Sequence, residues 1–192
     1  MTTGLTLNNT QNGGAFIGSA GDDTMTNSGN VVLVEGAQGN DSITSSGSSD
    51  TINGGAGNNT IVLTGTGTNN MVHGGISSIN DASGGSNTLF TYAIGVHNDT
   101  LASHDILVAR DGTGNSNVVT TTVSNFAPGD VIELSTSHGI HLVTSANLSS
   151  IITSHIADNS SGNAVLTLGG ETITFTGVHT SALTASEFTL IA

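Results

Sequence analysis

The chain has 192 residues, enough for one domain or two small ones, and its 35% hydrophobic and 3% aromatic content leaves no thick core of large rings. Its net charge is −13 with a single Lys or Arg, which excludes binding to nucleic acid and to anionic membrane surfaces. It has no Cys, which excludes disulfides, cysteine zinc sites and cysteine nucleophiles. No apolar run approaches the ~18 residues of a transmembrane helix, so membrane insertion is not expected. The 14 acidic residues must therefore repel one another or hold cations.

Residues 1–17 precede the regular part of the sequence. Leu7 and Phe16 occupy places that match the apolar positions of the later repeats, but the glycines and acids of those repeats are missing here. We therefore expect this segment to form an apolar cap on the first coil. It has neither a basic nor a hydrophobic leader region, so no cleaved N-terminal secretion signal is expected.

Residues 18–62 repeat with a period of nine, as GSAGDDTMT, NSGNVVLVE, GAQGNDSIT, SSGSSDTIN and GGAGNNTIV. Glycine recurs at the fourth place of the repeat, an acid or amide at the sixth, and an apolar residue at the eighth. The three sets are Gly21, Gly39 and Gly57; Asp23, Asp41, Asp50 and Asn59; and Met25, Val34, Ile43, Ile52 and Ile61. A short fixed period of this kind is typical of a solenoid.

A repeat of nine residues is too short for a helix pair or a propeller blade. It suits a half-coil of about six turn residues and about three strand residues, so two repeats make one coil whose strands stack about 4.8 Å from those of the next coil. The eighth-place side chains then point inward as two ladders, which are Leu7, Met25, Ile43 and Ile61 on one side and Phe16, Val34 and Ile52 on the other. Glycine at the fourth place permits the positive φ that a tight turn needs.

After residue 62 the pattern weakens. One extra residue, Leu63, shifts the frame, which then resumes over residues 64–90 with Met71 and Leu89 at the apolar place. Asn80 occupies that place in the intervening repeat. We therefore expect residues 73–81 to form a bulge or loop rather than a regular repeat.

The turns carry the chemistry that this pattern predicts. Turns on one side of the solenoid come from alternate repeats, so Asp23 and Asp41 should stack in neighbouring coils. Two carboxylates with nearby carbonyls, including those of Gly21 and Gly39, form an all-oxygen site of the kind that Ca²⁺ prefers. We predict one calcium site at Asp23 and Asp41, a partial site at Asp41 and Asn59, and a third around Asp50, which lies on the opposite side of the solenoid.

A structural role without metal is the alternative for each of these residues. Asp and Asn favour turns because they bond to their own backbone. This interpretation is favoured for Asn59, Asn69 and Asn87, since an amide adds no charge to a site. Stacked Asn residues can instead form hydrogen-bonded ladders along a solenoid.

The stretches GSAGDDTMT, GAQGNDSIT and GGAGNNTIV resemble the GGxGxDxUx nonapeptides of RTX (repeats-in-toxin) proteins. The resemblance implies a calcium-bound parallel β-roll. It covers residues 18–62 well and residues 64–90 loosely. The repeat at 27–35 departs from the family pattern because Val32 stands where the acid belongs. The resemblance therefore implies fewer calcium ions than a complete array would hold.

Residues 91–192 have a more ordinary β pattern. We expect strands at 106–109 and 118–123, and a Pro-Gly turn between two strands within 123–135. Apolar residues at helical spacing predict a helix over 147–157, and alternation around Gly169 and Gly170 predicts a hairpin over 163–177. Thr184 and Glu187 have the spacing of a capping box.

The C-terminal stretches NFAPGDVIELS, TLGGETITFTGV and ALTASEFTLIA resemble the ends of RTX proteins that are exported by type I secretion. The resemblance implies an uncleaved C-terminal secretion signal and an extracellular or cell-surface location. Calcium at such a location is abundant enough to fill weak sites.

The sequence thus predicts an all-β fold: a right-handed parallel β-roll with its cap over residues 1–90, followed by a β-rich module over residues 91–192 with one or two short helices. No HExxH, GxSxG or P-loop motif is present, so we do not expect the protein to be an enzyme. The function predicted is that of a secreted, calcium-binding structural protein that forms homo-oligomers or homopolymers in a surface layer, filament or biofilm matrix. The alternative is a calcium-dependent adhesin or lectin-like module that binds cell-surface glycans, for which Tyr92 is the only Tyr and no Trp is present.

Overall fold

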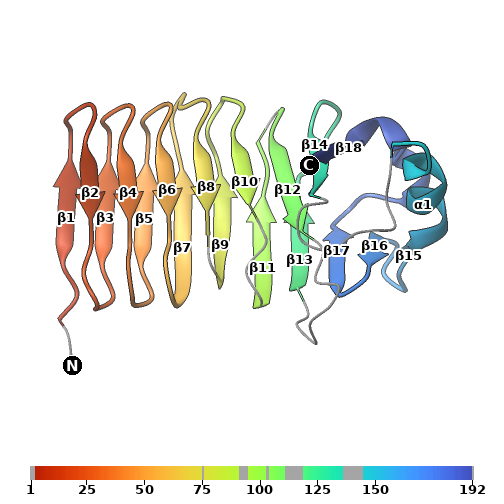
Figure 1. The fold of residues 1–192 in the computed structure, drawn as a ribbon, viewed down its shortest axis with the longest axis horizontal. Coiled ribbons are helices and arrows are strands. Elements are labelled where there is room, and N and C mark those ends of the chain that lie inside the picture. The colour runs from red at the N-terminus through yellow and green to blue at the C-terminus, as the bar shows by residue number, and fades with distance from the viewer. Residues whose placement is uncertain are drawn as a thin grey trace.

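The computed structural model describes residues 3–74, 76–90, 95–102, 104–110, 119–135 and 145–191. The chain winds back and forth between two stacked sheets, one of ten strands and one of eight. Figure 1 shows the coils in a row from the N-terminus, with the single described α-helix, α1 (Leu148–His155), at the other end. The predicted β-roll is confirmed, and no described helix is long and apolar enough to cross a membrane.

Strands alternate between the two sheets along the chain. In spatial order, the ten-stranded sheet contains β1 (Thr6–Asn9), β3 (Thr24–Asn27), β5 (Ser42–Ser45), β7 (Asn58–Leu63), β9 (Ile76–Asp81), β11 (Gly95–Thr100), β13 (Val119–Ser124), β17 (Glu171–Phe175), β16 (Ala164–Leu168) and β15 (Ile156–Asp158). The eight-stranded sheet contains β2 (Ala15–Ile17), β4 (Leu33–Glu35), β6 (Thr51–Asn53), β8 (Met71–His73), β10 (Thr88–Phe90), β12 (Ile106–Arg110), β14 (Val131–Ser135) and β18 (Phe188–Ile191).

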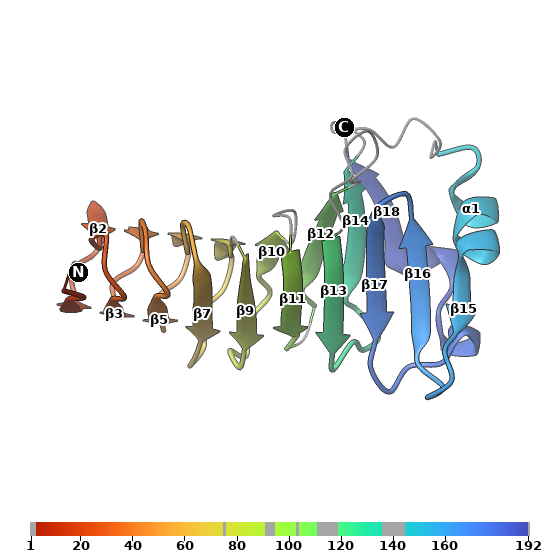
Figure 2. The same ribbon diagram turned by 90° about the horizontal axis from the view of Figure 1, so that it is seen from below.

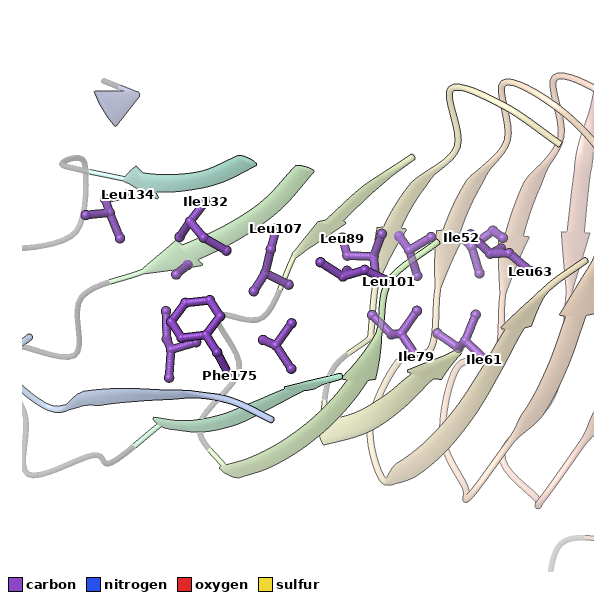
Figure 3. Packing of buried hydrophobic residues seen from close by; sticks show 14 of the residues in the cluster. Ile52, Ile61, Leu63, Ile79, Leu89, Leu101, Leu107, Ile132, Leu134 and Phe175 are labelled. Carbon is purple, nitrogen blue, oxygen red and sulfur yellow. The ribbon is translucent and has the colours of Figure 1, made fainter. Parts of the chain in front are cut away.

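The core lies between the sheets and consists of two facing rows of apolar side chains. In the ten-stranded sheet Leu7, Met25, Ile43, Ile61 and Ile79 pair in register. In the eight-stranded sheet the row is Phe16, Val34, Ile52, Val72, Leu89, Leu107 and Ile132. Figure 3 shows how side chains from the two sheets point toward one another. Both predicted ladders are therefore confirmed.

Residues 3–17 of the predicted cap form the first coil of the described roll. Its strands β1 and β2 pair with β3 and β4 in the same register that joins the later coils. Leu7 and Phe16 occupy the apolar rows, although both are only half-buried because no coil covers them from the other side. Strand formation depends on the apolar rows and on strand pairing. It does not depend on the repeat glycines and acids, which this segment lacks.

Two assignments after residue 62 were wrong. Met71 is 43% exposed, and its neighbour Val72 takes the apolar place. Residues 76–81 of the expected bulge or loop form strand β9, which pairs regularly with β7 and buries Ile79 while Asn80 is exposed. The cause is that the turns after β7 and β8 differ in length from the earlier turns, whereas the strands stay in register.

The two sheets continue across residue 90. Strand β10 pairs with β12, and β12 pairs with β14, all in parallel. The division into domains at residue 90 stays a prediction. One residue of the second half breaks the apolar row: Asp99 pairs with Ile79 on one side and with Val123 on the other, and it is buried.

The C-terminal end closes the ten-stranded sheet with antiparallel strands. The predicted hairpin is confirmed as β16 and β17, and β15 adds to it in antiparallel. The predicted helix is confirmed as α1, which lies beside this end in Figure 2. The Thr184–Glu187 capping box is present at a short 3₁₀-helix (Ala185–Glu187). A second 3₁₀-helix covers Thr180–Ala182.

Candidate metal centre

The chain crosses between the sheets through two columns of turns, which lie at opposite edges of the roll in Figure 1. The first turn column leads from the eight-stranded to the ten-stranded sheet; it comprises residues 18–23, 36–41 and 54–57 and continues into the first two residues of β7, Asn58 and Asn59. The second turn column leads back and comprises residues 28–32, 46–50, 64–70 and 82–87. All the predicted metal ligands lie in these two columns.

Three side chains of the first turn column point inward and join neighbouring coils. The Oδ1 atom of Asp23 accepts the backbone N–H of Leu5 (2.6 Å), and Oδ1 of Asp41 accepts the N–H of Asp23 (2.8 Å). The Oδ1 atom of Asn59 accepts the N–H of Asp41 (2.9 Å). The structure therefore brings Asp23, Asp41 and Asn59 together in one buried row, as the repeat spacing predicted.

Glycines at the fourth place allow these turns to stack closely. Gly39 and Gly57 have φ values of 121° and 117°, in the region that favours glycine. A Cβ on Gly39 would lie 2.5 Å from the carbonyl oxygen of Gly21 in the coil before it, so no side chain fits there. Gly21 itself does not have a positive φ, so the conformational reason predicted for all three glycines applies to two of them.

Among the predicted ligands, Asp41 has the environment that best suits a cation. Its Oδ2 atom is buried and has no hydrogen-bond partner in the described structure. The carbonyl oxygen of Gly54 faces the same point as this atom, because a Cβ placed on Gly36 would collide with both oxygens. Burial raises the pKa of Asp41, and the charges of Asp23 and Asp22 raise it further. A buried carboxylate oxygen beside a carbonyl, with no donor, fits a hard cation such as Ca²⁺.

Asp23 lies in the equivalent place one coil earlier, but it has donors of its own. The backbone N–H of Ser19 donates to its Oδ2 atom, and the Ser19 hydroxyl donates to Oδ1 (2.9 Å). Burial acts to raise its pKa, but the hydrogen bonds from Leu5 and Ser19 outweigh burial and lower it. Its Oδ2 atom also faces the carbonyl oxygen of Gly36 across the space beside Gly18. Asp23 can therefore hold a cation, but its charge is already compensated in part.

Asp50 belongs to the second turn column, and its oxygens are occupied. The N–H of Val32 donates to its Oδ1 atom (2.9 Å). The Asn27 amide (2.8 Å) and the Ser45 hydroxyl (2.9 Å) both donate to its Oδ2 atom. Burial raises its pKa, and these hydrogen bonds oppose the rise. The geometry at Asp50 is complete without a cation, in agreement with the alternative structural role.

The inward row of the second turn column continues farther than the sequence indicated. The N–H of Asp50 donates to Asn70 (2.9 Å), that of Asn70 to Asn87 (2.9 Å), and that of Asn87 to Asp105 (2.9 Å). The N–H of Asp105 then donates to Asp130 (3.0 Å). Asn70 therefore takes the place assigned to Asn69, which is exposed. The buried Val72, two residues later, was the signal that could have corrected this frame.

In the described part of the chain, eight acidic residues are buried, so much of the acidic charge lies in the interior and not on the surface. The described residues contain no group of three or more His, Asp or Glu side chains that could hold a metal ion. A metal site here must therefore take backbone carbonyls among its ligands. Such an all-oxygen set suits Ca²⁺ and does not suit metals that prefer nitrogen or sulfur.

A family model for the RTX calcium-binding nonapeptide repeat, in four copies, matches residues 33–61. The chain carries RTX repeats. These repeats bind calcium, and the match includes Asp41, Asp50 and Asn59. The first turn column of the chain therefore has both the repeat sequence and, at Asp41 Oδ2, a buried oxygen of the kind that binds calcium.

Comparison with solved structures finds a likeness to the extracellular lipase LipA from Serratia marcescens. The TM-score is 0.38 and the sequence identity is 14%. The match covers 94% of this chain but 40% of the lipase chain, so this chain spans less than half of that enzyme. No curated protein sequence matches the chain.

Proposed function

We propose that this RTX protein is a secreted, calcium-stabilised structural component without enzymatic activity, which self-associates at the cell surface in a surface layer, filament or extracellular matrix. The observation that supports the proposal is the pair of end strands at the N-terminal side of the described roll. Strands β1 and β2 are the end strands of their two sheets there. An end strand presents a row of backbone N–H and C=O groups that can pair with another chain.

Exposed apolar side chains and the absence of charge favour contact at this end. Leu5 is 42% exposed and Ile17 is 53% exposed. Residues 3–21 contain no acid and no base, although the whole chain has a net charge of −13. Two copies can therefore meet at this end without placing acidic side chains face to face.

The C-terminal end is built differently. In the ten-stranded sheet the end strand is β15, which has three residues, and α1 contacts the neighbouring β16. In the eight-stranded sheet the end strand is β18, which has four residues. Strand length does not separate the two ends, since β1 has four residues and β2 has three. The exposed apolar side chains and the absence of charge favour association between two N-terminal ends, and growth into a filament or lattice would need a second contact, for which β18 is the candidate strand.

Sedimentation velocity with and without calcium tests self-association. We expect concentration-dependent dimers or larger species in calcium, and we expect the double variant Leu5→Lys/Ile17→Lys to stay monomeric. Met71→Lys is the matched control, since Met71 is also 43% exposed but lies on an internal strand of the eight-stranded sheet. A wild-type chain that stays monomeric at high concentration in both conditions would refute the proposal.

Export by type I secretion without N-terminal cleavage is part of this proposal. The RTX repeats support it, because such repeats are a feature of proteins that use this route. The intact mass of the protein recovered from the medium, before and after inactivation of the type I exporter, is the direct measurement. We expect an uncleaved chain that is lost from the medium when the exporter is inactive. A processed N-terminus, or export that continues unchanged, would contradict this part.

A calcium-dependent glycan-binding module is the second candidate. The observation in its favour is a stacked pair of rings, His73 and Phe90, on the outer face of the eight-stranded sheet, with centroids 4.3 Å apart. Flat ring surfaces of this kind suit sugar rings. Glycan-array binding that is abolished by a calcium chelator and by Phe90→Ala would favour this candidate over self-association.

A further inference from the structure

We infer that the Asn59 side-chain amide takes the place of a calcium ion, so that the row of calcium sites in the first turn column ends at Asp41. Asn27 and Asn87 likewise place an amide where a cation would otherwise lie, at the second turn column. The inference rests on the proposed calcium binding at Asp41. According to this inference, the three asparagines determine which turns of the roll bind calcium and which do not.

The orientation of the Asn59 amide is fixed by its neighbours. The backbone N–H of Asp41 donates to one end of the amide at 2.9 Å, so that end is the oxygen. The nitrogen is then at the other end, where three carbonyl oxygens surround it. It donates to those of Gly55 (3.3 Å), Gly57 (3.5 Å) and Gly74 (3.5 Å).

Asn59 and Asp41 hold equivalent positions in successive coils. A Cβ on Gly54 would meet the Asn59 nitrogen and the Gly74 carbonyl oxygen, while a Cβ on Gly36 would meet Asp41 Oδ2 and the Gly54 carbonyl oxygen. At Asn59 the amide nitrogen, a donor, therefore faces the Gly74 carbonyl oxygen. At the equivalent point of the preceding coil, two acceptors face each other, namely Asp41 Oδ2 and the Gly54 carbonyl oxygen. The first pair attracts and is complete, whereas the second pair needs a cation or a proton between its oxygens.

Asn27 supplies the same kind of donor in the second turn column. The Gly29 N–H donates to its Oδ1 atom (3.2 Å), which again places the nitrogen at the other end. That nitrogen donates to Asp50 Oδ2 (2.8 Å), to the Ser45 hydroxyl oxygen (3.1 Å) and to the Gly29 carbonyl oxygen (3.0 Å). A neutral amide thus sits among three oxygens, one of them a carboxylate.

Asn87 repeats this arrangement farther along the roll. Its Oδ1 atom accepts the N–H of Asn70 (2.9 Å). Its nitrogen donates to Asp81 Oδ2 (2.7 Å), to the Ser83 hydroxyl oxygen (2.9 Å) and to the Gly85 carbonyl oxygen (3.1 Å). In both columns, therefore, an amide at the centre of three oxygens keeps the turns together without metal.

The exchange of one amide for a carboxylate should convert such a turn into a calcium site. In Asn59→Asp the donor is replaced by an acceptor, and the surrounding carbonyls of Gly55, Gly57 and Gly74 then lack a positive partner. Asn58→Asp is the matched control, because it adds the same charge at the adjacent exposed residue. Asp41→Asn is the reverse change and should place an amide where the cation binds.

Isothermal titration of the full chain with CaCl₂ tests the inference by stoichiometry. Relative to the wild type, we expect Asn59→Asp to bind one more calcium ion, Asp41→Asn to bind one fewer, and Asn58→Asp to bind the same number. Thermal unfolding in EGTA and in calcium gives a second measurement: Asn59→Asp should be less stable than Asn58→Asp in EGTA and should gain more from calcium.

Three results would overturn the inference, and they are distinguishable. If the wild type binds calcium but Asn59→Asp and Asn58→Asp have the same stoichiometry and the same gain in melting temperature, the role assigned to Asn59 is wrong and the proposed function stands. If the wild type takes up no calcium, the calcium part of the proposed function fails and the inference fails with it. If Asn59→Asp is unfolded in EGTA, calcium should refold it, and a failure to refold also counts against the inference.

Discussion

The two turn columns are built from the same nine-residue repeat, yet they balance their buried carboxylates in different ways. In the first, Asp41 Oδ2 has no donor and faces a carbonyl oxygen. In the second, Asp50 Oδ2 receives an amide and a hydroxyl donor from Asn27 and Ser45. The difference comes from the residue that lies five positions before each carboxylate: Gly36 offers no side chain, whereas Ser45 offers a hydroxyl, and Asn27 of the preceding coil adds an amide. A repeat can therefore depend on calcium along one edge and be independent of it along the other.

Removal of calcium should have the largest effect on stability, and it should affect the first turn column more than the second. A ligand at 100 times its Kd stabilises the folded state by about 2.7 kcal/mol. We expect EGTA to remove stabilisation of this order and to increase hydrogen exchange at residues 36–41 more than at residues 46–50. Hydrogen exchange followed by mass spectrometry measures this directly. Equal loss of protection at both columns would show that the comparison is wrong.

Substitutions of Asp41 and Asp50 should differ in their dependence on calcium. Asp50→Ala leaves the Val32 N–H without an acceptor and removes the carboxylate partner of the Asn27 amide, so it should cost about 1–3 kcal/mol with or without calcium. Asp41→Ala should remove most of the calcium-dependent stability and cost less in EGTA. Urea unfolding of both variants in calcium and in EGTA is the measurement. A cost at Asp50 that disappears in EGTA would place a calcium ion there after all.

In the second half of the roll, two buried carboxyl groups are stabilised in a third way, by protonation. Burial raises the pKa of Asp99 to about 7, and a hydrogen bond from the Ile79 N–H opposes the rise. Burial also raises the pKa of Asp105 to about 7; a hydrogen bond from the Ala102 N–H opposes this, while the charges of Asp81 and Asp130 add to it. Both folded-state pKa values lie above the unfolded value of 3.8.

The sign of the resulting pH dependence follows from these shifts. The folded chain binds more protons than the unfolded chain between pH 3.8 and about 7, so the stability contributed by Asp99 and Asp105 is fully present below pH 3.8 and is lost as the pH rises through 7. In EGTA, the melting temperature should therefore fall between pH 5 and pH 8. Asp99→Asn should flatten this fall, and an unchanged slope would contradict the role given to Asp99.

The smallest effect is expected on the outer side of the first turn column. There the Asn40 N–H donates to Asp22 Oδ1 (2.7 Å), and the Asn58 N–H donates to Asn40 Oδ1 (2.9 Å), all on exposed residues. Asn40→Ala should cost about 0.5–1.5 kcal/mol, because water can replace the lost acceptor. The cost should be the same in calcium and in EGTA, which thermal unfolding would measure. A strongly calcium-dependent cost would mean that the outer row also contributes to the site.

The regular part of this fold could be predicted from sequence because one distance repeats. Where successive coils differ by 18 residues, as at Asp23 and Asp41, the periodicity gives both the strand register and the stacked carboxylates. The prediction failed where turn lengths vary, since Asp50 and its partner Asn70 are separated by 20 residues and Asn70 and Asn87 by 17. A fixed frame cannot follow such changes, so Met71, Asn69 and Asn80 were misplaced.

The chemistry of the candidate site was predictable only in part. The repeat identified Asp23, Asp41 and Asn59 as neighbours, but it gave no information on which oxygens already have donors. That depends on residues such as Asn27, which is 23 residues from Asp50 and belongs to another coil. The buried Asp99 was also missed, because nothing in a local pattern indicates that an acid will replace an apolar residue in the core row.

The antiparallel pairing of β16 and β17 also affects the order in which the chain can fold. These two strands are joined by a tight turn at Gly169 and Gly170, so their contacts are the most local of any sheet contacts in the described structure. Hairpins of this kind form in about 1–10 μs, whereas parallel partners such as Val119 and Glu171 must first close a long loop. We therefore expect the hairpin to form first, because its contacts are local, and each coil can then add to it in turn toward the N-terminus. The coil of β1 and β2 would then be the last described part of the roll to become ordered.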